Sequence, residues 1–222
     1  MTWGDLFDPQ LAIDSLPYIL QGIWYTLLIS ILSMIFGLAL SVILAVMRSS
    51  HSILLKWPAR FYISFMRGMP MIVFLFLLYF GLPVIGVEWK ALTAAIVGFS
   101  LNSAAYMAEI NRAAIASVPK EQWDAAMVFG ASYRQALTAI VIPQAFRIAI
   151  PSLGNVFLDL IKSSSLAAVI SVPEMFHMSQ IVAGRAYDTL TMYTLVAIIY
   201  WLICLAASAL QNLLEKRFPI IS

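Results

Sequence analysis

The chain has 222 residues, of which 62% are hydrophobic and 11% are charged, and its formal net charge is +2. Soluble domains carry about 25% charged residues, so this composition excludes soluble enzymes and disordered proteins, and the small net charge gives no reason to expect nucleic acid as a partner. The sequence predicts an integral membrane protein with a single domain over residues 1–222, since no linker, repeat or low-complexity tract divides it.

Long stretches without charge predict where the chain crosses the membrane, because a spanning helix needs about 20 apolar residues. Residues 15–47 carry no charge and no turn cluster, so we expect one long tilted helix there. Further spans are expected over residues 68–87, 91–108 and 189–214, and one with a polar interruption over residues 148–172. The sequence therefore predicts an all-α membrane protein with five transmembrane helices.

Basic residues in short loops indicate the orientation, because cytoplasmic loops are enriched in Lys and Arg. They follow the first and third predicted spans and occupy the C-terminus: Arg48, His51, Lys56, Arg60, Arg112, Lys120, Arg134, Arg147, Lys216 and Arg217. The N-terminal segment carries Asp5, Asp8 and Asp14 and no base. We expect an outside N-terminus and a cytoplasmic C-terminus, which agrees with an odd number of spans.

The start of the second predicted span contains a helix-breaking segment. Pro70 removes a backbone donor, and broken helices at membrane depth are tolerated where they line a cavity. We therefore expect Gly68, Met69 and Pro70 to line a substrate cavity. For Arg67 two alternatives stay open, namely a side chain that extends to the cytoplasmic interface and one that contacts a ligand. Glu109 and Arg112, at the end of the third span, are expected to form a structural ion pair.

Residues 115–139, between the third and fourth predicted spans, have the pattern of two short helices. Ser117–Glu121 combines a capping Ser, a Pro for the first turn and an acidic residue near the positive helix end. Gly130 is expected to end the first helix, and Ser132 to cap a second one. These residue types fit an amphipathic helix lying on the bilayer as well as they fit a protein-docking element.

The fourth predicted span carries polar residues that suggest a binding site, because charge within a membrane is costly. Asn155, Asp159 and Ser163 follow one another at helical spacing and share one face. Asp159 either pairs with Lys162, three residues on, or faces the amine of a zwitterionic substrate. The predicted substrate-binding residues are Asp159, Asn155, Ser163, Ser164, Gly68, Met69 and Pro70. The alternative for the two serines is a hydrogen bond back to their own helix.

One spacing favours docking for residues 115–139. Asp124-Ala125-Ala126 is followed after three residues by Gly130, and nine residues later by Ile140-Val141-Ile142-Pro143. This pattern resembles the E-A-A-x3-G-x9-I-x-L-P signature of ATP-binding cassette (ABC) import permeases, with Asp124 in place of Glu and Ile142 in place of Leu. The resemblance implies that an ATPase couples to this loop through Asp124, Ala125, Ala126, Gly130, Ile140 and Pro143.

Further segments narrow the resemblance to permeases for polar amino acids. Four segments resemble this group, namely residues 67–83, 105–112, 143–145 and 162–166. The last one departs in part, because the family more often has an acid and a Thr after the lysine that corresponds to Lys162. Residues 59–64 and 100–106 look most like the cystine-type members. Together these matches lie within residues 20–215.

The resemblance implies the type I ABC importer permease fold, five helices with a cytoplasmic coupling-helix loop. It implies the membrane subunit of an amino-acid importer in the bacterial inner membrane, with L-cystine favoured as substrate. The implied partners are a second copy of the chain, a solute-binding protein outside and an ATPase that binds ATP and Mg²⁺. The chain itself is expected to hold no cofactor or metal and to be no enzyme.

The sequence contains no G-x-x-x-x-G-K-[ST] phosphate-binding loop. This agrees with ATP hydrolysis by a separate subunit. The residues also leave a rival function open. A stand-alone secondary transporter or channel would use Asp159 and Lys162 as an ion-coupled relay, but five spans without a repeat are few for such a protein.

Overall fold

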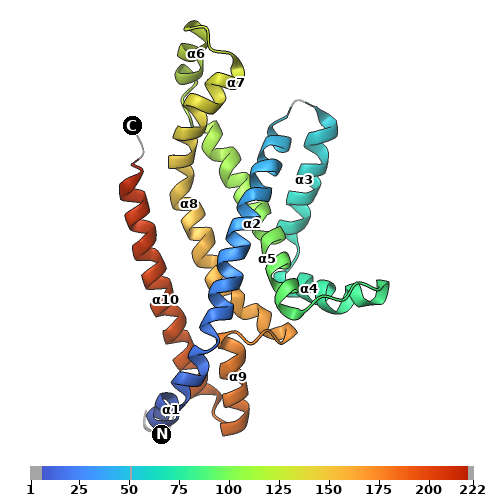
Figure 1. Ribbon diagram of the computed structural model, residues 1–222, viewed down its shortest axis with the longest axis vertical. Coiled ribbons are helices and arrows are strands. Elements are labelled where there is room, and N and C mark those ends of the chain that lie inside the picture. Colours follow the sequence, from blue (N-terminus) through green and yellow to red (C-terminus); the bar gives the residue numbers. More distant parts are fainter. Residues whose placement is uncertain (1–6, 51, 220–222) are drawn as a thin grey trace.

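The computed structural model describes residues 7–50 and 52–219, and their regular elements are all helices (Figure 1). Four stretches in this part of the chain are long and apolar enough to cross a membrane: α2 (Ile23–Ser49), α5 (Ala91–Ala116), the stretch Tyr133–Ile170 and α10 (Thr189–Arg217). A bent pair, Ile53–Gly68 with Met71–Ile85, gives a fifth crossing if it is counted as one span. The expected all-α membrane fold is confirmed.

The first predicted helix, residues 15–47, is wrong as one continuous helix. The chain forms α1 (Pro9–Leu20), turns at Gln21 and Gly22, and then forms α2. A Cβ atom on Gly22 would lie 2.5 Å from the backbone nitrogen of Met175. Glycine at this turn therefore allows a close approach of two backbones that are distant in sequence, which no local turn signal announced.

The second predicted span, residues 68–87, is also wrong in its bounds. Helix α3 (Ile53–Gly68) begins within the segment expected to be a loop, and the chain bends by 104° before α4 (Met71–Phe76). The expected break lies at Met69 and Pro70, both in extended conformation, because Pro cannot donate to the preceding turn.

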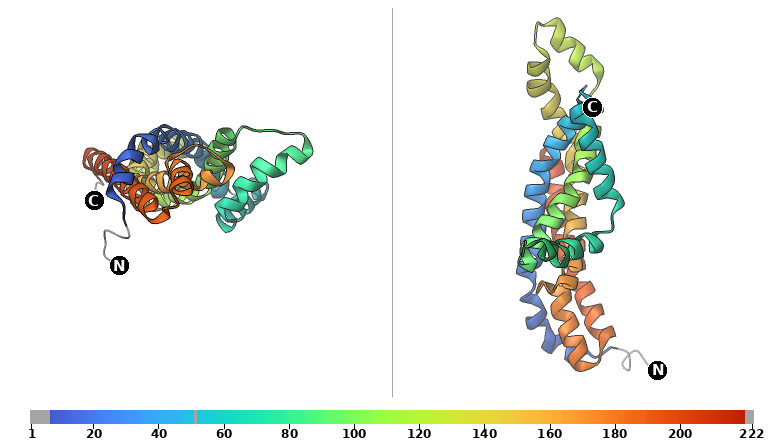
Figure 2. Two further views of the ribbon diagram at one scale, coloured as in Figure 1. Left: turned by 90° about the horizontal axis from the view of Figure 1, so that it is seen from below. Right: turned by 90° about the vertical axis from the view of Figure 1, so that its right-hand side faces the viewer.

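After this bend the chain forms a lateral arm that projects sideways from the long helices (Figure 2). We use "lateral arm" for residues 71–85, which comprise α4, the π-helical turn η2 (Leu77–Gly81) and the 3₁₀ turn η3 (Leu82–Ile85). Many of its apolar side chains are exposed in the single chain, most of all Val84 and Ile85.

Residues 115–139 form the two expected short helices, α6 (Lys120–Val128) and α7 (Tyr133–Ala136). Gly130 joins them with φ +80°, and Ser132 begins α7 with a reciprocal cap that involves Gln135. The expectation that Ser117 caps α6 is wrong, because Pro119 holds the capping position and the Ser117 hydroxyl donates to its own helix, to the Ala113 carbonyl at 2.9 Å.

The fourth crossing is longer than the expected span, residues 148–172. It runs through α7, the π-helical turn η4 (Leu137–Val141), α8 (Ile142–Ser163) and the 3₁₀ turn η5 (Ser164–Ile170). The loop expected at residues 173–188 contains a further helix, α9 (Met175–Ala186). Helices α6 and α7 lie at one end of the molecule, while α1 and α9 lie at the other (Figure 1).

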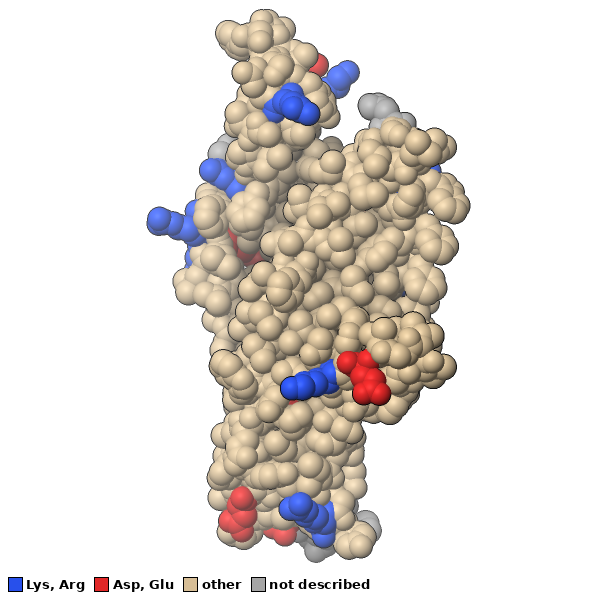
Figure 3. Space-filling view, turned by 45° about the vertical axis from the view of Figure 1, so that its right-hand side comes forward, with Lys and Arg blue, Asp and Glu red and all other residues tan. Residues whose placement is uncertain are grey.

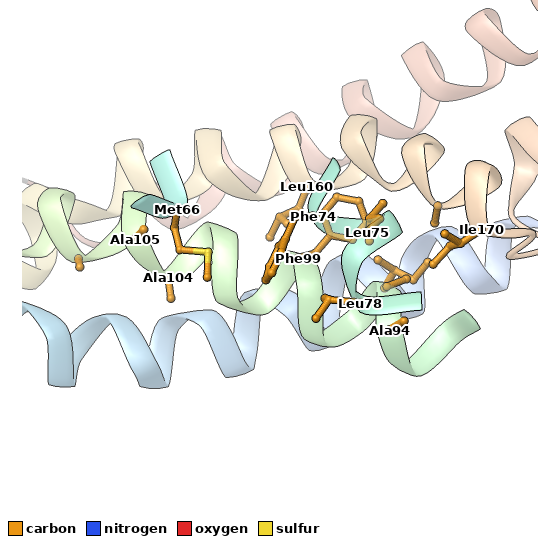
Figure 4. Packing of buried hydrophobic residues seen from close by; sticks show 14 of the residues in the cluster. Met66, Phe74, Leu75, Leu78, Ala94, Phe99, Ala104, Ala105, Leu160 and Ile170 are labelled. Atoms are coloured by element: carbon orange, nitrogen blue, oxygen red, sulfur yellow. The ribbon is translucent and has the colours of Figure 1, made fainter. Parts of the chain in front are cut away.

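The core forms where α5 packs against α2, α3, α4 and α8. Phe99 of α5 lies among Phe74, Leu75 and Leu160, as Figure 4 shows. Small residues line much of the buried face of α5 and allow close helix contact: Ala94, Ala95, Gly98, Ala104, Ala105 and Ala108. On the face seen in Figure 3, charged side chains are few and separated by wide uncharged areas, as a lipid-facing surface requires.

Candidate functional site

A groove of about 950 Å³ runs along α5 between α3 and α8. Its floor is one stripe of α5, in which Phe99, Asn102, Tyr106 and Ala113 recur at helical spacing. Charged groups line it from several elements: Arg67 of α3, Glu109 and Arg112 of α5 and Asp159 of α8. A hollow with fixed charges of both signs, formed by membrane-spanning helices, suits a small polar or zwitterionic solute.

The structure brings two of the predicted substrate-binding residues, Asp159 and Ser163, into this groove. Asn155 is exposed on the same helix but is not among the residues that line the groove. Ser164 is fully buried, and its hydroxyl donates back to the Ile161 carbonyl at 2.7 Å. Gly68 lines a second cavity of about 560 Å³ instead.

Met69 and Pro70 line neither of these two cavities. They form the bend that places Arg67, the third residue before Pro70, at the edge of both. Met69 and Pro70 therefore support the groove by positioning Arg67 and do not line it.

Asp159 and Lys162 form an ion pair, with 2.8 Å between Oδ1 and Nζ. The single chain leaves 68% of the Asp159 side chain and 59% of the Lys162 side chain exposed. Lipid tails are a poor neighbour for such a pair, so this face needs water or protein against it.

Contacts between α3 and α5 fix the Arg67 end of the groove. The Asn102 amide donates to the Met66 carbonyl, and the Tyr62 hydroxyl donates to the Leu101 carbonyl, each at 2.8 Å. The Arg67 guanidinium lies 5.5 Å from the centroid of the Tyr106 ring. This arrangement holds the cation over α5, because a guanidinium is attracted to an aromatic face.

Glu109 and Arg112 form the expected ion pair, at 2.9 Å. The Glu109 carboxylate also lies 3.4 Å from Arg48 at the end of α2. Two cations thus share one acid and connect α2 to α5, which gives Glu109 a structural role that the spacing alone indicated only in part.

The predicted ATPase-coupling residues lie in and next to the hairpin α6–α7, by which we mean residues 119–136. Asp124, Ala125 and Gly130 are exposed, and Ala126 packs inward. Ile140 and Pro143 lie beyond the hairpin, where it continues into α8.

The hairpin has a rigid base and an apolar tip. Trp123 stacks on Tyr133 with 5.2 Å between ring centroids. Phe129 is 91% exposed, next to the exposed Val128. A firm element with an exposed apolar tip, at one end of the bundle, is suited to a concave surface on another protein.

Sequence analysis missed a buried acid, Glu174, which has no exposed surface. Its carboxylate caps α9 by accepting from the backbone N–H groups of Phe176 at 2.8 Å and His177 at 2.6 Å, and it accepts from the Tyr200 hydroxyl at 2.6 Å. Burial raises the pKa of Glu174 to about 7 despite these donors. The Pro173–Glu174 pair before an apolar segment was the available signal for a helix start.

No cluster of three or more His, Cys, Asp or Glu side chains suited to a metal ion occurs in residues 7–50 and 52–219.

Comparison with known proteins gives consistent matches over nearly the whole chain. The family model described as "binding-protein-dependent transport system inner membrane component" matches residues 37–219. The probable amino-acid ABC transporter permease protein YckA of Bacillus subtilis is 56% identical, over 98% of this chain and 96% of its own length. The L-cystine transport system permease protein TcyB of the same organism is 42% identical, over 90% and 86%.

Solved structures agree in fold. A crystal structure of an amino acid ABC transporter with histidines contains a chain 32% identical to this one, with a TM-score of 0.90 over 98% of this chain and 100% of that one. An inward-facing structure of the MetNI methionine ABC transporter has a TM-score of 0.70 at 19% identity, over 89% and 96%, and shows the likeness of the fold alone.

Proposed function

The chain belongs to the inner-membrane components of binding-protein-dependent ABC transport systems, as an amino-acid permease, and we propose that it forms the translocation pathway for L-cystine. The groove along α5 supports this proposal most directly, because it places two carboxylates and two arginines in one hollow between membrane-spanning helices. The likeness to TcyB favours cystine over other polar amino acids.

Within the groove, Asp159 faces the substrate's ammonium group and Ser163 offers a hydroxyl. Asn155, one helical turn before Asp159, reaches the substrate from the same face once a second subunit closes the groove. Gly68, Met69 and Pro70 hold the bent edge of the pathway, and Ser164 packs behind it.

A separate ATPase, which binds ATP and Mg²⁺, supplies the energy, and the chain itself catalyses no reaction. The hairpin α6–α7 docks into that ATPase through Asp124, Ala125 and Ala126, and Gly130 provides the sharp turn that the docking shape needs. Ile140 and Pro143 connect the hairpin to α8, which carries Asp159. Closure of the ATPase thereby moves the helix that forms one wall of the groove.

A second copy of this chain covers the groove face. The Asp159–Lys162 pair is exposed in the single chain, and the lateral arm has a broken helix followed by π and 3₁₀ turns. Lipid cannot satisfy irregular backbone at membrane depth, so protein is the better neighbour for both. Two copies related by a two-fold axis would close a shared pathway between them.

The hairpin end of the molecule lies in the cytoplasm of a bacterial cell, and the end with α1 and α9 lies outside the inner membrane. The solute-binding protein delivers the amino acid to that outer end. Rocking of the two subunits then opens the groove to each side in turn.

The test is uptake of radiolabelled L-cystine by liposomes that contain the permease, its ATPase and its binding protein. We expect uptake that requires ATP and the binding protein and that falls at least about ten-fold in Asp159→Asn, because loss of one partner from a charge pair enclosed by the second subunit costs about 2–5 kcal/mol. Glu88→Gln, an exposed acid outside the groove, is the control and should transport normally. Uptake driven by an ion gradient without ATP would support the rival, a secondary transporter.

A further inference from the structure

Arg67 lines the groove, but the proposed function gives it no contact with the substrate. It lies in the last turn of α3, one residue before the final Gly68 and the break at Met69 and Pro70, and it lines both cavities. Asn102 holds the adjoining Met66 carbonyl, so the last turn of α3 is fixed against α5. The ring of Tyr106 orients the guanidinium at 5.5 Å.

Arg67 forms no direct ion pair within residues 7–50 and 52–219, and its charge acts on the Glu109 carboxylate only across a longer distance. Glu109, the acid that lines the same two cavities, is bound by Arg48 at 3.4 Å and by Arg112 at 2.9 Å. No ion pair and no side-chain hydrogen bond joins Arg67 to a carboxylate in the described part of the chain. A cation at membrane depth is costly without an anion, and the planar guanidinium fork fits a carboxylate with two hydrogen bonds.

The groove separates the Arg67 guanidinium from the Asp159 carboxylate by a length that a bound dipolar molecule can help to bridge. Leu160, next in sequence to Asp159, packs beside Phe99 in Figure 4. Tyr106, which holds Arg67, lies two helical turns after Phe99 on α5, or about 10 Å at 1.5 Å per residue. The long side chain of Arg67 covers part of this length, and a bound dipolar molecule can bridge the remainder.

We propose that Arg67 binds the carboxylate of the transported amino acid while the substrate's ammonium group faces Asp159. This inference rests on the proposed function and adds the second pole of the site. It makes the groove selective for zwitterions, because an amine that lacks the carboxylate leaves Arg67 without its anion. Arg67 thereby determines specificity, and the Tyr106 ring positions it.

The test compares amino acids with their decarboxylated amines on the purified permease–ATPase complex in detergent, without the binding protein. The probes are L-cystine with cystamine and L-arginine with agmatine, and affinities are measured by calorimetry. We expect wild type to bind the amino acid of at least one pair about ten-fold or more tightly than its amine, the ratio that a lost charged hydrogen-bond pair implies.

In Arg67→Gln the affinity for that amino acid should fall about ten-fold while the affinity for the amine changes less than two-fold. Arg67→Lys, which keeps the charge and loses the fork, should lie between wild type and Arg67→Gln. Arg60→Gln is the matched control, because Arg60 lies on the same helix and lines only the second cavity. It should leave both affinities unchanged.

An unchanged ratio of the two affinities in Arg67→Gln would overturn the inference, and so would an equal loss for amino acid and amine. The proposed function would stand in either case if Asp159→Asn still weakened binding of the amino acid. A wild-type complex with normal ATPase activity that binds neither amino acid would overturn both.

Discussion

The Asp159–Lys162 pair fits two different roles, a structural ion pair within α8 and a contact with the substrate. Their ion pair of 2.8 Å satisfies the structural interpretation, and the position of Asp159 in the lining of the groove satisfies the functional one. The two accounts differ in what happens when both charges are removed together, because a structural pair is replaceable by a neutral pair and a substrate contact is not.

We expect Asp159→Asn to weaken uptake strongly, and the double change Asp159→Asn with Lys162→Gln to restore stability without restoring uptake. Removal of one partner leaves the other charge unpaired, which typically costs about 3–5 kcal/mol for buried pairs and less for a pair this exposed. Thermal unfolding of the purified complex and uptake by liposomes separate the two effects. Normal uptake by the double variant would make Asp159 a structural partner only.

Glu174 should make the stability of the protein depend on pH. Burial raises its pKa from 4.5 to about 7, so folding favours the protonated form. The resulting stability is fully present below pH 4.5, where both folded and unfolded chains are protonated, and is lost as pH rises through about 7. The shift corresponds to an effect on the order of 3 kcal/mol.

Melting temperature should therefore fall between pH 5 and pH 8 more steeply in wild type than in Glu174→Gln, whose amide stays neutral. Glu88→Gln changes an exposed acid and should keep the wild-type slope. Equal slopes in wild type and Glu174→Gln would show that the carboxyl is not held protonated by its site.

At the scale of elements, the hairpin α6–α7 depends on one backbone conformation. Gly130 joins the two helices at φ +80°, a region that side chains with a Cβ atom rarely adopt. Gly86, which directly follows the lateral arm at φ +83°, has the same requirement in a different place. Substitutions at the two glycines therefore distinguish loss of ATPase docking from a general effect of backbone strain.

Gly130→Leu should abolish ATP-coupled uptake and co-purification of the ATPase while leaving membrane insertion intact. Gly86→Leu carries a similar strain, about 1–2 kcal/mol, and should retain the ATPase. Affinity purification followed by measurement of bound ATPase checks this. Retention of wild-type ATPase binding by Gly130→Leu would contradict a docking role for the hairpin.

The elements that were predicted correctly are those whose signals are local. The hairpin followed from Gly130 and Ser132, and the break in the second span followed from Pro70, because turn and cap chemistry acts over a few residues. One error was local, since Pro119 and not Ser117 holds the capping position of α6, and another involves contacts between distant segments. At the turn the backbone of Met175 lies where a side chain on Gly22 would be, and no residue near Gly22 announces that neighbour.

The groove was predictable only in part for the same reason. Asp159 and Ser163 were found because they share a helix face, whereas the approach of Arg67 requires the bend at Pro70 and the fixed end of α3 on α5. Sequence spacing describes one helix at a time, and a cavity between helices also depends on how they pack.

At the scale of the whole molecule, we expect the two ends to lie on opposite sides of the membrane. The hairpin α6–α7 and the last turn of α10 lie at one end, and α1 and α9 at the other (Figure 1). Lys216 and Arg217 at the end of α10 favour the cytoplasm for that side, whereas α1 at the other end carries no Lys or Arg.

Single cysteines at Gln10 and Gln122, each in a Cys204→Ala background, test this orientation in intact cells. Both glutamines are exposed, at opposite ends of the molecule. A membrane-impermeant thiol reagent should label position 10 directly and position 122 only after the membrane is permeabilised. The reverse pattern would require an inverted topology.

The most direct test of the central claim, that the groove along α5 is the substrate pathway, is protection of a cysteine inside it. Ser152→Cys in the Cys204→Ala background places a thiol in the groove, and Ser64→Cys places one in the second cavity as a control. In the assembled importer, a saturating transported amino acid that contains no disulfide should slow modification of position 152 by a positively charged methanethiosulfonate reagent and leave position 64 unaffected. Modification of position 152 at the same rate with and without a transported amino acid would contradict the account.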